Sequence, residues 1–323
     1  MKALLVGPES SPFVDVLRSK LRTKWELNCL DGYSAGDAPS ADFASAHALV
    51  SIRFNRSWPD MPHLKLVQAP ATGLNNIDLE AVPAGVPVCN AYGHEVAIAE
   101  YVLFGMLACA HNILPIHREF SQGRWSWGDD GIFPVQDEID GATVCLVGLG
   151  KIGTETAKRA KALGMRVLAC NRSSREAVPY VDELADLSHL AAFAARADFV
   201  VINCALTDAT RGIVDASVLR AMKPSAFIIN VSRGPLIEEQ ALFAALSSRQ
   251  IAGAVLDVWY RYPDAEEKHP RPSAFAFHEL DNVIMTPHIS GWTHGMVRKR
   301  WAEVAQNLDN LAAFKPLINV VKA

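Results

Sequence analysis

The sequence of 323 residues lacks several features that would assign it to a specialised class of protein. It has no strong excess of charge, since 31 basic and 35 acidic side chains give a net charge of −4 with histidine neutral. Nothing in this balance indicates a nucleic-acid or membrane-surface partner. No internal repeat, low-complexity tract or block of like charges occurs, which excludes a repeat array or a long charged tail.

Metal-ligand spacings and membrane-spanning runs are also missing. The six cysteines are scattered, mostly inside apolar runs, with no CxxC pair. This usage is typical of small buried side chains in a reducing cytosol, so we predict a cytoplasmic protein without a metal site. The apolar run at residues 3–6 is too short for a signal peptide and predicts a first strand. The longest apolar stretch, Val96 to Pro115, contains Glu100 and His111 and indicates a buried helix instead of a membrane span.

Strand and helix signals alternate in both halves of the chain. Half of the residues are hydrophobic, and this length can form two packed domains. The first half predicts strands at residues 3–6, 25–29, 48–52, 64–68 and 86–89, then a long helix over 94–120 and an irregular connector. The second half predicts strands near 143–148, 165–170, 199–203, 226–231, 251–256 and 282–285. An amphipathic helix over 293–314 has no strand of its own, so we expect it to pack on the first domain.

A glycine turn follows the first strand of the second half. That strand is almost entirely apolar, as burial on both faces requires, and Gly148-Leu-Gly150-Lys-Ile-Gly153 then opens a helix. Gly148 can take the tight turn, Gly150 leaves room for a pyrophosphate, and Gly153 lets the helix pack closely on the strand. Because the free N–H groups of the helix point at the phosphates, this context predicts a dinucleotide-binding site.

The next strand ends without the acidic residue that commonly follows such a turn. An aspartate or glutamate about 20 residues past the glycines would hold the ribose hydroxyls of NAD. This chain instead has Asn171-Arg172-Ser173-Ser-Arg175. A guanidinium can bind a 2′-phosphate through charge-assisted hydrogen bonds, helped by neighbouring hydroxyls. We therefore predict NADP(H) as the preferred cofactor over NAD(H). The alternative is that both arginines lie in a solvated loop.

Three charged residues follow predicted strands in the second half. Arg233 comes just after one strand, Asp257 after the next, and His288 after the last. Each alone has an ordinary structural interpretation, as a loop cation, a helix cap or a packed histidine. The carboxyl ends of strands in a doubly wound sheet open onto the ligand crevice. We therefore expect the three side chains to converge near the nicotinamide end of the cofactor.

These motifs, in this order, resemble the D-isomer-specific 2-hydroxyacid dehydrogenase family over nearly the whole chain. The matching segments are Thr72–Asp78, Val96–Glu100, Gly148–Gly153, Leu206–Gly212, Val231–Ile237, Gly253–Trp259 and Thr286–Thr293. The Asn171-Arg-Ser pattern is similar to that of the glyoxylate/hydroxypyruvate reductase branch, whose members use NADPH. The resemblance implies an α/β fold of two doubly wound parallel-sheet domains, with a Rossmann cofactor domain inserted into a flavodoxin-like substrate domain. We place the substrate domain at 1–93 and 292–323 and the cofactor domain, with the connecting helix, at 94–291, and we expect a cleft at the hinge.

The resemblance also implies roles for single residues around the reacting centre. Reduction of a 2-keto acid needs a cation on the carboxylate and ketone, which Arg233 offers, and a proton donor, for which His288 titrates near neutrality. Asp257 would bind the nicotinamide carboxamide, with Ser232 and Leu206 beside the ring. Further cofactor-binding residues would be Lys151, Ile152, Cys204, Thr207, Val231 and Gly291.

The first part of the chain would supply substrate contacts. Backbone amides of Thr72, Gly73 and Leu74 would hold the substrate carboxylate. Arg53 lies where the family has a substrate-facing loop, although surface charge explains it equally well. Family members are typically homodimers through the connecting helix, and the apolar run at 96–110 fits that expectation.

One departure from the family concerns the histidine. The family's usual partner is a glutamate five residues past the aspartate, and this chain has Tyr262 there. A neutral phenol cannot raise the imidazole pKa as a carboxylate does. Either Glu266 or Glu267 replaces the missing anion, or the Tyr262 hydroxyl orients a histidine whose pKa is near the ordinary value of about 6.5. We favour the second interpretation.

The sequence thus predicts an NADPH-dependent reductase of small 2-keto acids such as glyoxylate or hydroxypyruvate. Two alternatives stay open. Tyr262 fits a dinucleotide-sensing interaction protein with weak catalysis. It also fits oxidation of another small anion, because relatives that act on formate lack the glutamate as well.

Overall fold

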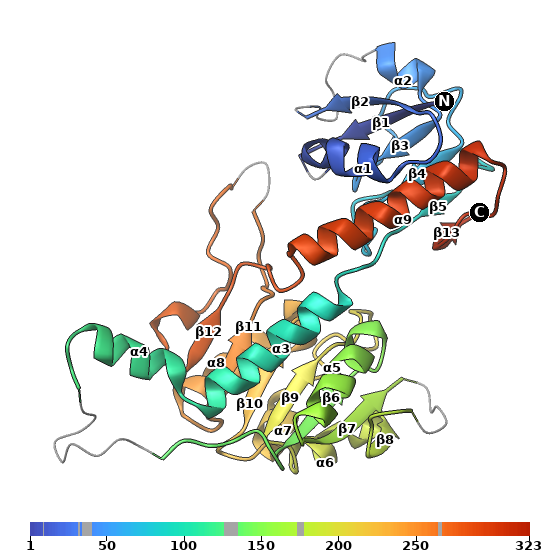
Figure 1. Cartoon of the computed structure of the whole chain (residues 1–323). Helices are drawn as coiled ribbons and strands as arrows, with labels where there is room; N and C mark the ends of the chain where they lie inside the picture. Colours follow the sequence, from blue (N-terminus) through green and yellow to red (C-terminus); the bar gives the residue numbers. More distant parts are fainter. Residues whose placement is uncertain (9, 32, 34–40, 126–134, 173–177, 264–266) are drawn as a thin grey trace. The chain divides into compact units, whose positions relative to one another are not determined.

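The computed structural model describes the chain except residues 9, 32, 34–40, 126–134, 173–177 and 264–266. The chain divides into two compact units, Met1–His94 with Trp292–Ala323 and Glu95–Gly291. Each unit is an α/β structure built on its own sheet (Figure 1). This confirms the predicted fold class.

The sheet of the first unit has the strand order β13-β5-β4-β3-β1-β2. Strands β1 to β5 are parallel and follow the 2-1-3-4-5 order of flavodoxin-like sheets. Helix α9 (His294–Ala312) packs on this sheet, because Trp301, Val304 and Leu308 share a buried cluster with Leu5 and Val50. The predicted return of the last helix to the first unit is thus confirmed. The bounds are β1 (Lys2–Val6), α1 (Val14–Lys20), β2 (Glu26–Leu30), α2 (Ala41–Ser45), β3 (Ala48–Val50), β4 (Leu66–Gln68), β5 (Val88–Cys89) and β13 (Val320–Lys322).

The sheet of the second unit is parallel throughout, in the order β12-β11-β10-β9-β6-β7-β8. The chain starts this sheet at β6 and winds outward in both directions, so the topological switch point lies between β6 and β9. Ligands of doubly wound sheets bind at the carboxyl ends of the strands beside that point. The strands are β6 (Thr143–Val147), β7 (Arg166–Asn171), β8 (Glu183–Asp186), β9 (Phe199–Ile202), β10 (Phe227–Asn230), β11 (Gly253–Leu256) and β12 (Val283–Met285).

Helices cover both faces of this second sheet, which is why its strands are apolar on both sides (Figure 1). Along β6, Val144 and Leu146 pack in the cluster that contains residues of α3 and α5, whereas Cys145 and Val147 pack in the cluster with α6, α7 and α8. The helices are α3 (Glu95–Ala110), α5 (Lys151–Ala162), α6 (Leu190–Ala194), α7 (Ala216–Ala221) and α8 (Glu239–Ser247).

The prediction of a single helix over 94–120 is wrong, because the segment forms two helices, α3 and a separate α4 (Ile113–Ser121). Asn112 adopts a left-handed conformation, with φ 47°, and ends the first helix. Pro115 then falls in the first turn of α4, where its missing N–H leaves no helical bond unmade. Within the described residues, no single helix has the length and hydropathy to cross a membrane. Helices α3 and α4 have the required length and hydropathy only when they are taken together, and the pair is bent by 63°.

Two strands were not predicted. β8 is a short edge strand of sequence Glu-Leu-Ala-Asp, with no run of apolar residues to mark it. β13 has three residues and pairs antiparallel with β5, which corrects the expectation of a purely parallel first sheet. Both strands are defined by the neighbour that they pair with and not by a periodic pattern of their own.

Candidate active site

The glycine turn after β6 has the geometry that a dinucleotide needs. A Cβ on Gly148 would lie 2.6 Å from the backbone N of Cys204, and one on Gly153 would lie 2.4 Å from the carbonyl oxygen of Gly148. Gly148 also has φ 101°, a conformation that side chains rarely adopt. A Cβ on Gly150 would meet nothing within 4 Å. Two glycines therefore serve close packing, and the third leaves open space before the first turn of α5, where a phosphate group fits.

The end of β7 lies next to this turn. The side-chain Oδ1 of Asn171 accepts a hydrogen bond from the N–H of Leu149, within the glycine turn, at 3.5 Å. Arg172 is exposed, and no hydrogen bond or ion pair engages its guanidinium among the residues that the structure describes. Ser173 and Arg175, which were predicted to assist it, lie outside the described residues. A free guanidinium at this strand end fits the predicted phosphate contact.

The ends of β9 and β10 meet beside the turn. The hydroxyl of Ser232 donates to the carbonyl of Cys204 and so joins the two strand ends. Thr210 lies in the family-like segment Leu206–Gly212, where the sequence analysis gave it no role. It is buried and closes the loop after β9, since its hydroxyl donates to the carbonyl of Ala205 at 2.7 Å and accepts from the N–H of Thr207 at 2.8 Å. Leu206 is half-buried, whereas Val231 is buried at 4% exposure.

Arg233 follows β10 and is half-buried. Its Nη1 donates to the carbonyl of Ser232 at 2.7 Å, and in the described part of the chain no carboxylate pairs with its guanidinium. A cation in this state leaves most of its hydrogen-bond donors for an anionic ligand. Its charge lowers the pKa of both His288 and Tyr262, which places the three groups in one electrostatic environment.

Asp257, at the end of β11, has no exposed surface and holds the loop after β12. Its Oδ1 accepts hydrogen bonds from the hydroxyl of Thr286 at 2.6 Å and from the N–H of Ile289 at 2.8 Å, and its Oδ2 accepts from the N–H of Ser290 at 2.9 Å. These contacts make Asp257 an anchor of the loop that carries His288. They differ from the carboxamide contact implied by the family resemblance, which stays a prediction.

His288 lies in this loop, is exposed to solvent and has φ 59°. Desolvation by the surrounding protein lowers its pKa below the ordinary 6.5, and the positive charge of Arg233 lowers it further, while Asp257 acts in the opposite direction. The expected pKa near 6.5 is therefore too high, because the sequence did not show how far the surrounding protein removes the ring from water or that the charge of Arg233 acts on it.

Tyr262 contacts His288 through its ring and not through its hydroxyl. The ring centroids are 5.6 Å apart in an edge-to-face arrangement. The hydroxyl oxygen accepts a hydrogen bond from the N–H of Trp259 at 3.2 Å, and burial raises the pKa of the phenol. The hydroxyl-to-histidine contact that we favoured is thus corrected to a packing contact. Of the alternative partners, Glu267 is exposed and Glu266 lies outside the described residues.

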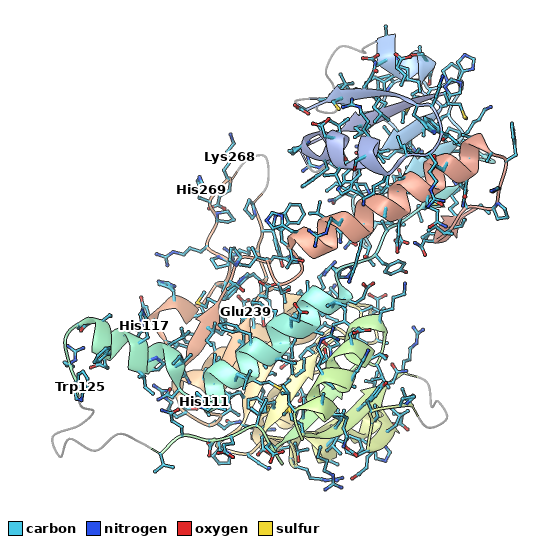
Figure 2. All side chains as sticks on the ribbon, viewed as in Figure 1. His111, His117, Trp125, Glu239, Lys268 and His269 are labelled. Carbon is cyan, nitrogen blue, oxygen red and sulfur yellow. The ribbon has the colours of Figure 1, made fainter. Side chains whose placement is uncertain are left out.

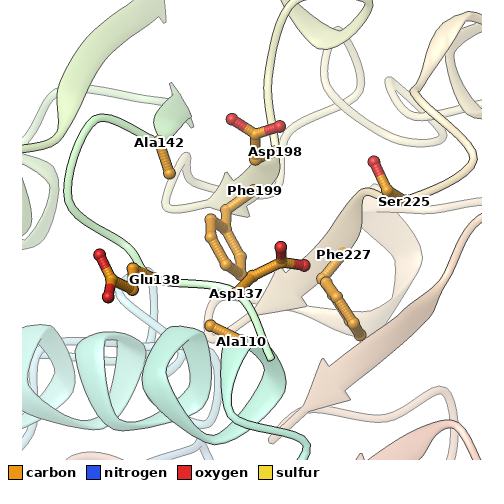
Figure 3. Close-up of a pocket in the computed structure, with 8 residues that line it drawn as sticks. All are labelled: Ala110, Asp137, Glu138, Ala142, Asp198, Phe199, Ser225 and Phe227. Atoms are coloured by element: carbon orange, nitrogen blue, oxygen red, sulfur yellow. The ribbon is translucent and has the colours of Figure 1, made fainter. Parts of the chain in front are cut away.

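A pocket of about 480 Å³ shares Tyr262, Thr286 and Pro287 with this site. Its other walls include Trp259 and Met285, and the segment with Lys268 and His269, whose side chains project from their ribbon, borders it (Figure 2). A second pocket, of about 320 Å³, contains Asp137, Glu138 and Asp198 (Figure 3). That pocket lies at the amino ends of β9 and β10, away from the glycine turn. In the part of the chain that the structure describes, no group of three or more potential metal ligands occurs.

The predicted substrate residues belong to the first unit. The hydroxyl of Thr72 donates to the carbonyl of Ala91 at 2.9 Å, and the side-chain amide of Asn90 donates to the carbonyl of Thr72 at 2.9 Å. These bonds fix the turn that continues through Gly73, which is exposed, and Leu74, which is half-buried. Arg53 is exposed. Gly291, a predicted cofactor residue, ends the second unit.

The fold and this arrangement of side chains are those of a dehydrogenase that uses a nicotinamide dinucleotide. The sequence model of the D-isomer specific 2-hydroxyacid dehydrogenase NAD binding domain matches residues 103–290. A glyoxylate reductase from Korarchaeum cryptofilum is 33% identical over 257 residues, which cover 79% of this chain and 74% of the relative. A hydroxypyruvate reductase from Blautia hydrogenotrophica is 34% identical over 267 residues, 80% of this chain and 79% of the relative.

Solved structures show the same similarity. An NADPH-dependent glyoxylate/hydroxypyruvate reductase from Sinorhizobium meliloti, in complex with NADP and malonate, superposes with a TM-score of 0.78 over 99% of this chain and 96% of that one, at 25% identity. The chain belongs to the D-isomer-specific 2-hydroxyacid dehydrogenase family and is an NAD(P)-dependent enzyme of that family.

Proposed function

We propose that this enzyme is an NADPH-dependent reductase of small 2-keto acids of the glyoxylate or hydroxypyruvate type, with D-2-hydroxy acids as products. One observation supports this most: the half-buried guanidinium of Arg233, which has no carboxylate partner among the described residues, lies in the same electrostatic environment as a histidine, at the carboxyl ends of a sheet with a dinucleotide cradle. The curated relatives include glyoxylate and hydroxypyruvate reductases.

The proposed chemistry divides between two side chains. Arg233 binds the substrate carboxylate and polarises the ketone, because its planar fork of donors matches two oxygens. His288 in its protonated form donates a proton to the ketone oxygen as this oxygen gains charge. When bound at the glycine turn, NADPH would supply the hydride for the carbonyl carbon. The proposal also assigns substrate binding to Arg53 and to the backbone of Thr72, Gly73 and Leu74.

NADPH is the proposed cofactor because the strand end that would meet the ribose carries Asn171 and Arg172 in place of a carboxylate, and no described residue pairs with the guanidinium of Arg172. Arg172→Ala should raise the KM for NADPH about tenfold or more and leave the KM for NADH within about twofold. Arg220→Ala is a matched control, since Arg220 is an exposed arginine in the last turn of α7. Equal effects of Arg172→Ala on both cofactors, or a wild-type preference for NADH, would contradict this assignment.

A panel of 2-keto acids with both cofactors tests the proposed reaction. Turnover of glyoxylate or hydroxypyruvate with NADPH, lost in His288→Gln and kept in the exposed control His278→Gln, is the expected result. NADPH binding without turnover of any keto acid would favour a dinucleotide-sensing protein, which the tyrosine at position 262 also fits. NADP-dependent oxidation of formate would identify the third alternative.

The proposed assembly is a homodimer through the connecting helices. Helix α3 exposes Phe104 at 57% and Leu107 at 37%, and α4 exposes Ile113, Leu114 and Phe120. Apolar side chains clustered in this way mark protein interfaces. Sedimentation equilibrium should give a dimer for the wild type and a monomer for Phe104→Lys. A monomeric wild type would refute the assignment.

A further inference from the structure

A chain of hydrogen bonds runs from helix α3 to the loop that carries His288. The hydroxyl of Tyr101 lies 2.6 Å from Oγ1 of Thr286. The Thr286 hydroxyl in turn lies 2.6 Å from Oδ1 of Asp257. The carboxylate then accepts bonds of 2.8 and 2.9 Å from the N–H groups of the two residues after His288. Neither Tyr101 nor its position in the helix has a role in the reaction proposed above.

The direction of these hydrogen bonds follows from the chemistry of the groups. An ionised carboxylate only accepts, so Thr286 must use its one hydroxyl proton toward Asp257. The oxygen of Thr286 is then the acceptor for the hydroxyl proton of Tyr101. Burial raises the pKa of Tyr101, so its phenol stays protonated and keeps donating at neutral pH. The donor and the acceptor of each hydrogen bond between Tyr101, Thr286 and Asp257 are therefore determined.

Helix α3 is itself held firmly against the sheet at this point. Gly105, one turn after Tyr101, packs so closely on β11 that an added Cβ would lie 3.3 Å from the side chain of Val255. Val255 is on that strand, two residues before Asp257, which directly follows the strand. The donor and the carboxylate are thus mounted on two elements in direct contact, which fixes the distance that the hydroxyl of Thr286 bridges.

The loop needs such support because His288 is left-handed at φ 59°. This conformation costs a residue with a side chain about 1 kcal/mol or more and persists only where its surroundings determine it. The bonds from Asp257 fix the backbone after His288. Thr286, two residues before it, is held on its other side by Trp259, whose ring N–H donates to the carbonyl of Thr286 at 2.9 Å.

We propose that Tyr101 is a positioning residue for the reaction: through Thr286 and Asp257 it holds the backbone at His288 so that the imidazole stays beside Arg233. The inference rests on the proposed role of His288 as proton donor. Removing the hydroxyl leaves the ring and its packing in place but removes one of the hydrogen bonds that hold the side chain of Thr286 in its position. The loop then samples other conformations, and the fraction of molecules with a correctly placed imidazole falls.

Tyr101→Phe tests the proposal in the full-length enzyme. We expect kcat for keto-acid reduction to fall about tenfold, as loss of one buried hydrogen bond implies, with the Kd for NADPH within about twofold of wild type. Thr286→Val should give a similar loss, Thr286→Ser should keep most of the activity, and the double variant Tyr101→Phe/Thr286→Val should lose little more than either single variant. Tyr260→Phe is the matched control, because its buried hydroxyl bonds to the carbonyl of Ile237 and not to this chain.

A second measurement does not depend on turnover. Among the described residues, Arg233, Asp257 and Tyr262 are the charged or titratable groups that face His288, and loosening the loop moves the ring out of the field of Arg233. An NMR titration should therefore show the pKa of His288 rising toward its ordinary value in Tyr101→Phe and unchanged in Tyr260→Phe. Wild-type kcat together with a wild-type His288 titration in Tyr101→Phe would overturn the proposal, as would equal losses in the Tyr260 control. If the wild type reduces no keto acid, the proposed function fails, and the titration still decides whether Tyr101 positions His288.

Discussion

Substituting Tyr262→Glu places a carboxylate beside His288, where the rest of the family usually has one. The tyrosine and histidine rings are 5.6 Å apart between centroids, so a carboxylate there would act over a similar distance. Coulomb's law at that distance raises the histidine pKa by about 2 at an effective dielectric constant of about 20, and by about 0.5 at about 80. His288 has an exposed surface but is partly desolvated, so we expect a rise between these two limits, of about 1.

The sign of the effect on the rate follows from the direction of catalysis. In reduction, His288 acts in its protonated form, so kcat/KM falls as the pH rises through the pKa of the free enzyme. In the wild type that pKa lies below 6.5, because partial burial and Arg233 outweigh Asp257. Tyr262→Glu should therefore retain its reductase activity to a pH about one unit higher.

The assay is kcat/KM for the best 2-keto acid between about pH 5 and 9, at saturating NADPH. Tyr262→Gln is the matched control, since it has the size of glutamate without the charge and also loses the hydrogen bond from the N–H of Trp259. Because both variants lose the ring, the glutamate variant should keep its activity to a pH about one unit above that of this control, and the difference isolates the charge. Superimposable profiles for the two variants would refute the electrostatic reasoning, and so would a fall at lower pH in the glutamate variant.

Further predictions concern the cradle, the cation and the buried aspartate. Gly150→Ala should fold with a wild-type Tm but lose NADPH affinity in a fluorescence titration, whereas Gly153→Ala should lower the Tm itself, because its Cβ would overlap backbone at 2.4 Å. Arg233→Gln should lower kcat/KM by about 10²-fold or more with an unchanged Kd for NADPH, and a Kd that rises in parallel would contradict the substrate role. Asp257→Asn should cost about 2–4 kcal/mol in urea unfolding, because one buried N–H of the histidine loop then faces an NH₂ group. A cost below about 1 kcal/mol would mean that the loop finds other partners.

The predictable parts of the fold are those in which the local structure accepts only one type of residue. Gly148 and Gly153 each lie where a Cβ would overlap backbone atoms, so only glycine fits, and the sequence pattern alone locates the turn. Strands buried on both faces are likewise visible as apolar runs. The break at Asn112 was missed because a left-handed residue between two apolar segments leaves the helical pattern almost unchanged.

The contacts of the site were predictable only in part. The order of the strands determines at which edge of the sheet a residue lies, but it does not determine the direction of its side chain. Arg233 and His288 are close enough to affect each other, as expected for residues that follow β10 and β12 on the two sides of β11. Asp257 lies at the same edge of the sheet, but its side chain accepts hydrogen bonds from N–H groups of the loop after His288. The sequence does not show where those N–H groups lie. Tyr101 gave no signal, since its contact with Thr286 spans 185 residues and depends on the packing of α3.

The replacement of the usual glutamate by Tyr262 does not argue against catalysis. An imidazolium without an anionic partner is a stronger acid, so each protonated molecule donates its proton more readily, while fewer molecules are protonated at neutral pH. These two effects oppose each other in the observed rate. The ring of Tyr262 packs edge to face on the imidazole at 5.6 Å, so the histidine still has a neighbour at this position that restricts its movement. The substitution is therefore expected to move the pH range of reduction downward and not to abolish it, which separates an enzyme adapted to lower pH from a protein that only binds the dinucleotide.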